Sequence, residues 1–201
     1  MKAIKLNVKE VEKIQIDHGL IYLDYGETSQ RLLSPTRGGG EFVATVTVRD
    51  IEFDGRNGKV AGMQVIEENA ATLKTTLLGM TQENLRLAIP GAKVVESAQG
   101  VIKNPKMGVI SADKYWKNVT MFAHTLDGKY KKITILNPMS EGEMTITTQH
   151  KAEGELGITF NAHYPMSDLD GDLWSVEDAT EISETPAQGG STDGQGTENQ
   201  S

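Results

Sequence analysis

The chain has no cysteine among its 201 residues. This absence excludes disulfide bonds, zinc sites with cysteine ligands and thiol nucleophiles. No apolar run approaches the roughly 18 residues that a membrane-spanning helix needs. The first ten residues alternate lysine with apolar residues and lack the hydrophobic segment of a signal peptide. We therefore expect synthesis in a cytoplasm and no association with a membrane.

Basic and aromatic residues are also scarce. Lys and Arg number 20 against 28 Asp and Glu, which gives a formal net charge of −8. This balance argues against a general nucleic-acid-binding protein, because such proteins carry a basic excess. Aromatic residues make up only 5% of the chain, which disfavours sugar binding by stacking. The four histidines have no metal-ligand spacing, so we predict no enzyme, no metal and no cofactor; they are His18, His124, His150 and His163.

Two short motifs resemble ligand sites but depart from them. The glycine-rich segment 36–40 lacks the GxGxxG spacing and precedes a predicted strand instead of a helix, so a flexible turn is the better interpretation. The acidic segment 168–172 resembles the start of a calcium-binding EF-hand loop. Leu173 and Ala179, however, stand where that loop needs glycine and glutamate. We interpret the second motif as a surface turn, with a weak cation site as the alternative.

Alternation of apolar and polar residues predicts a β domain over residues 1–177. The clearest alternation spans residues 155–164, and the other predicted strands lie at 117–126, 130–136 and 143–149. Asp127-Gly128 is a strong signal for a hairpin turn between two of these strands. Residues 178–201 carry five acidic residues, four glycines and no Lys or Arg, which is typical of a flexible acidic tail.

Two longer segments predict an unusually long β-hairpin. Residues 42–54 are apolar at even positions up to Val48 and at odd positions from Ile51, so we expect a bulge or bend near Arg49-Asp50. A turn follows over residues 54–58, and a second strand is predicted over residues 60–78. Strands of this length exceed the usual five or six residues. After them, Thr81 is a good N-cap for one short helix, which Pro90-Gly91 ends.

Carboxylates gather on the predicted hairpin. Asp50, Glu52 and Asp54 are every second residue after the predicted bend, so they would lie on one face of the strand. Glu68 falls on the more polar face of the second strand. A solvated sheet face is the ordinary explanation of such a pattern. The alternative is a sheet that lines a water-filled space with an excess of negative charge.

Several sequence segments between residues 40 and 176, taken in their order along the chain, resemble the major tail tube proteins of long-tailed (siphovirus-type) phages of Gram-positive bacteria. The segments include Lys59-Val-Ala-Gly-Met-Gln-Val-Ile-Glu-Glu, Thr81-Gln-Glu-Asn-Leu-Arg-Leu-Ala-Ile-Pro-Gly91, Lys114-Tyr-Trp-Lys-Asn-Val-Thr120 and Gly157-Ile-Thr-Phe-Asn-Ala-His-Tyr164. Their order carries the resemblance, since each segment alone is weakly specific. Residues 1–39 and the predicted tail show no such resemblance.

The resemblance implies a mainly β, sandwich- or barrel-like fold with one short flanking helix and a long hairpin. It implies hexameric rings in which each subunit gives four strands to an inner barrel, stacked into a tube in the virion tail. The tube would be a passive, negatively lined conduit for DNA ejection, assembled in the host cytoplasm with a tape-measure protein and tail terminator or baseplate proteins. Asp50, Glu52, Asp54 and Glu68 are then lumen-facing candidates. The ring-stacking candidates are Arg37, Gly38, Gly39, Gly40, Arg56, Asn57 and Gly58.

Two alternatives to this function remain. The chain could form the inner tube of a contractile tail or of a secretion system, which keeps the fold and changes the surroundings. It could instead be a monomeric β-sandwich that binds a carbohydrate or protein ligand. A binding module should stay monomeric at high concentration, whereas a tube protein should assemble.

Overall fold

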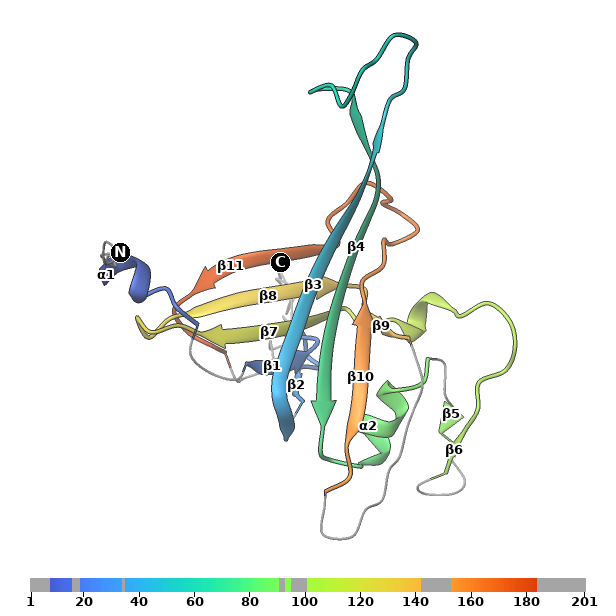
Figure 1. Cartoon of the computed structure of the whole chain (residues 1–201). Coiled ribbons are helices and arrows are strands. Elements are labelled where there is room, and N and C mark those ends of the chain that lie inside the picture. The colour runs from blue at the N-terminus through green and yellow to red at the C-terminus, as the bar shows by residue number, and fades with distance from the viewer. Residues whose placement is uncertain are drawn as a thin grey trace, which may run out of the picture.

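Two antiparallel β-sheets make up most of the protein, and their strands cross where the sheets pack against each other (Figure 1). The computed structural model describes residues 8–15, 19–33, 35–90, 93–94, 101–141 and 153–183. Within these residues a short helix, α2, lies at one end of the sheets and a long hairpin extends from the other. The predicted fold class, mainly β with a short helix and a long hairpin, is confirmed.

The first sheet has five strands in the order β11-β8-β7-β1-β2. Their bounds are Leu20–Leu23 for β1, Arg31–Leu32 for β2, Asn118–His124 for β7, Tyr130–Leu136 for β8 and Trp174–Ala179 for β11. The β7–β8 hairpin turns at Asp127-Gly128, where Gly128 has a φ of 78°. This confirms the turn that the sequence predicts, because glycine adopts positive φ without steric cost.

The second sheet has four strands in the order β3-β4-β10-β9. Their bounds are Thr36–Asp50 for β3, Gln64–Leu77 for β4, Leu156–Asn161 for β10 and Met139–Ser140 for β9. The smaller elements are α1 (Val8–Val11), a β5–β6 pair (Lys93–Val94 and Ile102–Lys103) and a 3₁₀ turn, η1 (Ala112–Lys114).

The hydrophobic core fills the space between the two sheets. In β10 the alternate residues Leu156, Ile158 and Phe160 are at most 3% exposed, as their period of two predicts. Leu73 on β4 and Val119 on β7 are fully buried beside them. Interleaved apolar side chains from both sheets thus hold the sandwich together.

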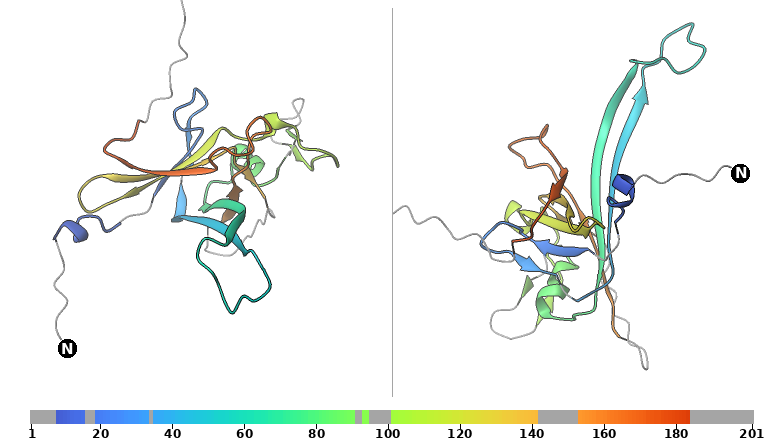
Figure 2. Two further views of the ribbon diagram at one scale, coloured as in Figure 1. Left: turned by 90° about the horizontal axis from the view of Figure 1, so that it is seen from above. Right: turned by 90° about the vertical axis from the view of Figure 1, so that its left-hand side faces the viewer.

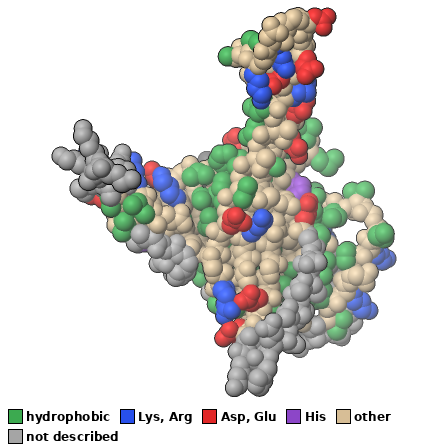
Figure 3. Space-filling model, viewed as in Figure 1, with side chains coloured by type: hydrophobic (Ala, Val, Ile, Leu, Met, Phe, Trp, Pro, Cys, Tyr) green, Lys and Arg blue, Asp and Glu red, His purple; other side chains and the backbone are tan. Residues whose placement is uncertain are grey.

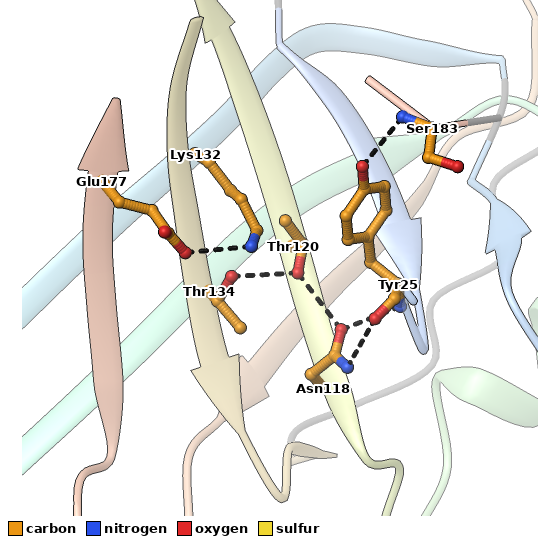
Figure 4. A network of polar contacts seen from close by, with 7 residues as sticks. All are labelled: Tyr25, Asn118, Thr120, Lys132, Thr134, Glu177 and Ser183. Carbon is orange, nitrogen blue, oxygen red and sulfur yellow. Dashed lines mark hydrogen bonds and ion pairs between the residues drawn. The ribbon is translucent and has the colours of Figure 1, made fainter. Parts of the chain in front are cut away.

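The far side of the five-stranded sheet is covered as well, which the alternation in β7 does not predict. Phe122 is buried there beneath the Tyr25 ring, with ring centroids 4.9 Å apart. Figure 4 shows the polar network beside it: the Asn118 side chain bonds the Tyr25 backbone, and Thr120 links Asn118 to Thr134. The Ser183 backbone N–H donates to Tyr25 Oη over 2.9 Å. The chain after β11 is therefore attached to this side of the sheet.

The predicted tail boundary at residue 177 falls within an element. β11 includes Asp178 and Ala179, and Lys131 on β8 bonds the Asp178 carboxylate. The first residues of the predicted tail thus extend the sheet. Residues 184–201 lie outside the described residues, as do the predicted strand at 143–149, His18 and His150.

Two irregularities in the β3–β4 ladder correct the sequence interpretation. Gly38 and Gly39, with φ of 75° and 72°, form a bulge inside β3, so the glycine-rich segment is not a flexible turn. The second irregularity lies on β4, where Glu67 is the extra residue opposite Thr47 and Val48. An irregularity is therefore present beside the predicted position, at Thr47/Val48, but its extra residue belongs to β4 and not to β3. From Gly40 onward β3 keeps its phase, and the later apolar residues belong to the hairpin tip.

The predicted short helix is confirmed as α2, which spans Gln82–Leu87. Thr81 caps it, and its side-chain oxygen accepts a hydrogen bond of 3.2 Å from the Asn84 backbone N–H. Leu87 and Ala88 are buried against the core. The helix closes the end of the sandwich opposite the hairpin tip (Figure 1).

Gly40 provides a test of how tightly the sheets pack. A Cβ atom there would lie 2.6 Å from Met121 Sδ and 3.0 Å from Ile21 Cδ1, both in the core. We expect Gly40→Val to destabilise the protein by about 1–3 kcal/mol through overpacking. Gly157→Val, on an open strand face with no atom within 4 Å, should be nearly neutral. Urea unfolding measures both, and equal effects would contradict the packing described here.

Candidate assembly surface

The β3–β4 hairpin is longer than the body that it packs on (Figures 1 and 2). Its near half lies against the five-stranded sheet, whereas its far half extends away from the body. Val46, Val48 and Ile66 in that far half are 50%, 52% and 61% exposed. Apolar strand residues of this kind are normally buried, so the exposed half of the hairpin is a candidate contact surface.

The register of the hairpin assigns its side chains to two faces. Phe42 pairs with Leu73, and the Phe42 ring contacts Trp174 of the five-stranded sheet with centroids 5.6 Å apart. Even-numbered residues of β3 therefore face the core side. Glu41 pairs with Lys74 and Thr47 with Glu68, so odd-numbered residues of β3 face away from the other sheet. We call this second side the outer sheet face.

The outer sheet face is polar and carries an acidic excess. Six carboxylates lie on it or at its rim, namely Glu41, Glu67, Glu68, Glu141, Glu153 and Glu155. Three cations accompany them, namely Arg37, Arg49 and Lys74. The excess is three negative charges when histidine is neutral. Figure 3 shows this face, much of which is tan, the colour of the backbone and of side chains that are neither charged nor hydrophobic.

Ion pairs order these charges along the face. Arg37 contacts Glu153 and Glu155 at 2.7 and 2.6 Å, and Lys74 lies 3.6 Å from Glu41. The hydrogen bond from Arg37 lowers the pKa of Glu153, and the same bond raises the pKa of Arg37. Exposed pairs of this kind contribute little to stability. Their main effect is to hold the side chains in place while the net acidic excess remains.

The four lumen-facing candidates lie in three different places on the hairpin. Glu68 lies on the outer sheet face opposite Thr47, whereas Asp50 pairs with Gln64 on the other face of the hairpin. Glu52 and Asp54 lie beyond the end of β3, in the tip loop. No single sheet face therefore carries all four carboxylates.

Asp50 and Glu52 have local roles at the hairpin tip. Gln64 Nε2 donates to Asp50 Oδ1 over 2.9 Å, and Lys59 Nζ lies 3.5 Å from the same carboxylate. The hydrogen bond from Gln64, followed by the Lys59 charge, lowers the pKa of Asp50. Arg56 lies 3.8 Å from Glu52 and donates to the Ile51 carbonyl. These contacts fix the shape of the loop where the two strands separate.

The ring-stacking candidates occupy opposite ends of the hairpin. Arg37, Gly38, Gly39 and Gly40 lie in and beside the β3 bulge near α2, where the surface forms an open depression bordered by Lys74 and Thr159. Arg56, Asn57 and Gly58 lie in the tip loop. The two groups are thus well separated along the long axis of the hairpin (Figure 1).

The sequence interpretation missed five of the six carboxylates on the outer sheet face. Glu41 could have been identified from the sequence, because it alternates with Val43 and Thr45 along one face of β3. This would have required assigning the same alternation to the whole strand. Glu67 required knowledge of the bulge in β4. Glu141 and Glu153 depend on tertiary contacts with Asn161 and Arg37, for which the sequence has no local signal.

The described residues also bear on metal binding and on membrane insertion. They contain no group of three or more His, Cys, Asp or Glu that could hold a metal ion. No helix in the described part of the chain is long and apolar enough to cross a membrane. Asp168 bonds the backbone N–H of Asp170, as expected of a surface turn.

Comparisons with known proteins give only distant likenesses. No family model matches the chain, and no curated protein does. One similar solved structure is a chain from the virion of a native gene transfer agent particle, with 11% identity and a TM-score of 0.40, over 73% of this chain and 92% of that one. Another is from the tail of an empty gene transfer agent particle with C6 symmetry, with 11% identity and a TM-score of 0.37, over 80% and 96%.

The Asp50 contacts predict a pH-dependent hairpin tip. Because its pKa is lowered in the folded state, the carboxylate stabilises the tip at neutral pH and loses this effect as the pH falls through its folded pKa. We expect NMR titration to give Asp50 a pKa below its ordinary value, and Gln64→Leu to move it back. Glu41→Gln, farther along the hairpin, should leave it unchanged. An unaltered Asp50 pKa in Gln64→Leu would contradict the assigned cause.

Proposed function

We propose that the chain is the subunit of a phage-type tail tube, in which copies join head to tail in six-membered rings that stack. The observation that carries this proposal is the free edge of β3. This strand has 15 residues and pairs only with β4, so one long side has no partner strand among the described residues. An exposed edge of that length invites pairing with another chain, and closure into a ring would cover it.

The size of such a ring supports the proposal. Six four-stranded sheets would contribute roughly 24 strands, and a spacing of about 4.8 Å with a tilt of about 40° gives a circumference on the order of 150 Å. The backbone diameter would then be about 48 Å. Side chains of about 5–6 Å on each wall leave a bore in the high thirties of Å. A hydrated DNA duplex would pass through it.

The chemistry of the outer sheet face suits the inside of the bore. Among the described residues this face is mostly polar and carries three excess negative charges per chain. Duplex DNA carries one negative charge per about 1.7 Å of its axis. Like charges would keep DNA from adhering to the wall. The tube is therefore a passive conduit with no enzymatic activity and no cofactor.

The two ends of the hairpin are placed for contacts between rings. The tip loop lies at one end of the subunit, and the bulge at Gly38-Gly39 lies at the other, beside α2 (Figure 1). When rings stack, the tip of each subunit in one ring would meet the base of a subunit in the next. The sequence resemblance to major tail tube proteins, which spans residues 40–176, supports the same arrangement in a virion tail.

Shortening the hairpin tests this function. In a variant with residues 52–62 replaced by an Asn-Gly turn, we expect a folded subunit that no longer forms tubes, because the ring-to-ring contact is lost. Negative-stain electron microscopy across a concentration series measures assembly, and circular dichroism checks folding. Glu27→Gln, in the exposed loop between β1 and β2, is the control and should assemble like the wild type.

Three results distinguish the alternatives. Tubes of normal length from the shortened variant would contradict the stacking role of the tip. A wild-type chain that stays monomeric at every concentration and binds a small ligand would favour the binding module. Co-purification of the tube with a sheath protein would favour the inner tube of a contractile tail.

A further inference from the structure

A loop on one side of the subunit exposes two apolar side chains completely. Met107 and Val109, between β6 and η1, are 103% and 100% exposed. Burial of either side chain in a contact would be favourable, because it removes apolar surface from water. The loop leaves the body beside β9, since the Trp116 N–H bonds the Pro138 carbonyl at the start of that strand. It extends on the right of the molecule in Figure 1.

The opposite side of the subunit has an apolar wedge, which we define as Val46, Val48, Trp174 and Val176. The two sheets meet where the Phe42 ring contacts the Trp174 ring. Beyond this contact the far half of β3 diverges from β11, and the four side chains of the wedge are between 38% and 52% exposed. Trp174 and Val176 pair with Ile135 and Ile133, so they face the core side of their sheet. In Figure 3, hydrophobic side chains gather to the left of the hairpin base.

The loop and the wedge belong to opposite edges of the four-stranded sheet. β9 is the edge beside the loop, and β3 is the edge beside the wedge. A head-to-tail ring brings one edge of each subunit against the other edge of its neighbour. Given the ring of the proposed function, we propose that Met107 and Val109 of one subunit insert into the wedge of the next, so that a second copy of this chain is the occupant.

The loop is basic, and the wedge face of β11 carries one carboxylate. Residues 101–112 contain Lys103 and Lys106 and no acidic residue. On β11, Asp178 shares the face of Trp174 and Val176 and pairs with Lys131, whereas Glu177 lies on the other face and pairs with Lys132. Asp178 is therefore the β11 carboxylate on the face of the wedge, and it would attract a lysine of the neighbouring loop alongside Lys131.

Because the natural chain has no cysteine, an engineered cysteine pair can report this contact directly. We would cross-link the full-length double variant Met107→Cys with Val176→Cys, using a short bis-maleimide under assembly conditions. A ladder of covalent oligomers is expected. The matched control, Met107→Cys with Glu27→Cys, places the second thiol in the β1–β2 loop behind the five-stranded sheet (Figure 2) and should give no ladder.

Imaging of the same samples separates this inference from the function on which it rests. Rings without a ladder of cross-linked oligomers would overturn the contact between Met107 and the wedge. They would not contradict the proposed function as a tube subunit. Absence of both rings and ladder would contradict the ring itself. As an independent check, Met107→Asp with Val109→Asp should abolish rings while the urea midpoint stays unchanged, and Met107→Leu with Val109→Ile should retain them. Rings from the aspartate variant would also overturn the contact.

Discussion

The free backbone edge of β3 is the constraint on which the rest of this structure depends. A strand of 15 residues presents a row of N–H and C=O groups that no second strand among the described residues pairs with. The edge has no bulge in its far half, because the extra residue, Glu67, lies on the partner strand. Natural proteins usually shorten or cover such edges. A long, regular and partly apolar edge is therefore the feature on which we base the proposal that β3 pairs with another chain.

Electrostatics and packing act on different faces of the same hairpin. The outer sheet face carries an acidic excess that sixfold repetition would multiply, so the small net charge of one subunit would give the ring a wall with a larger net negative charge. The core-side face carries Val46, Val48 and Ile66 past the body, where the described residues leave them at least half exposed. The Glu67 bulge preserves this division, since it lets Ile66 pair with Val48 on the core-side face while Glu68 stays on the outer sheet face.

Local sequence signals predicted most of the fold. The β7–β8 turn at Asp127-Gly128, the Thr81 cap and the alternation in β10 each depend on neighbouring residues, and each was confirmed. The hairpin register was not predictable from the sequence. Ile51 and Phe53 shift the apolar residues from even to odd positions, which looks like a bulge in the strand, but both lie beyond the end of β3. The outer-face carboxylates Glu141 and Glu153 come from distant segments. Their grouping depends on tertiary structure and leaves no periodic signal.

The most direct test of this account is a cryo-electron microscopy map of the assembled protein at side-chain resolution. The account predicts a closed ring of six subunits in which Glu68 and Thr72 line the bore, while Val48 and Asp50 lie within the wall. The five-stranded sheet should form the exterior. A map in which that sheet lines the bore, or in which the β3 edge stays unpaired in the assembly, would contradict the central claim.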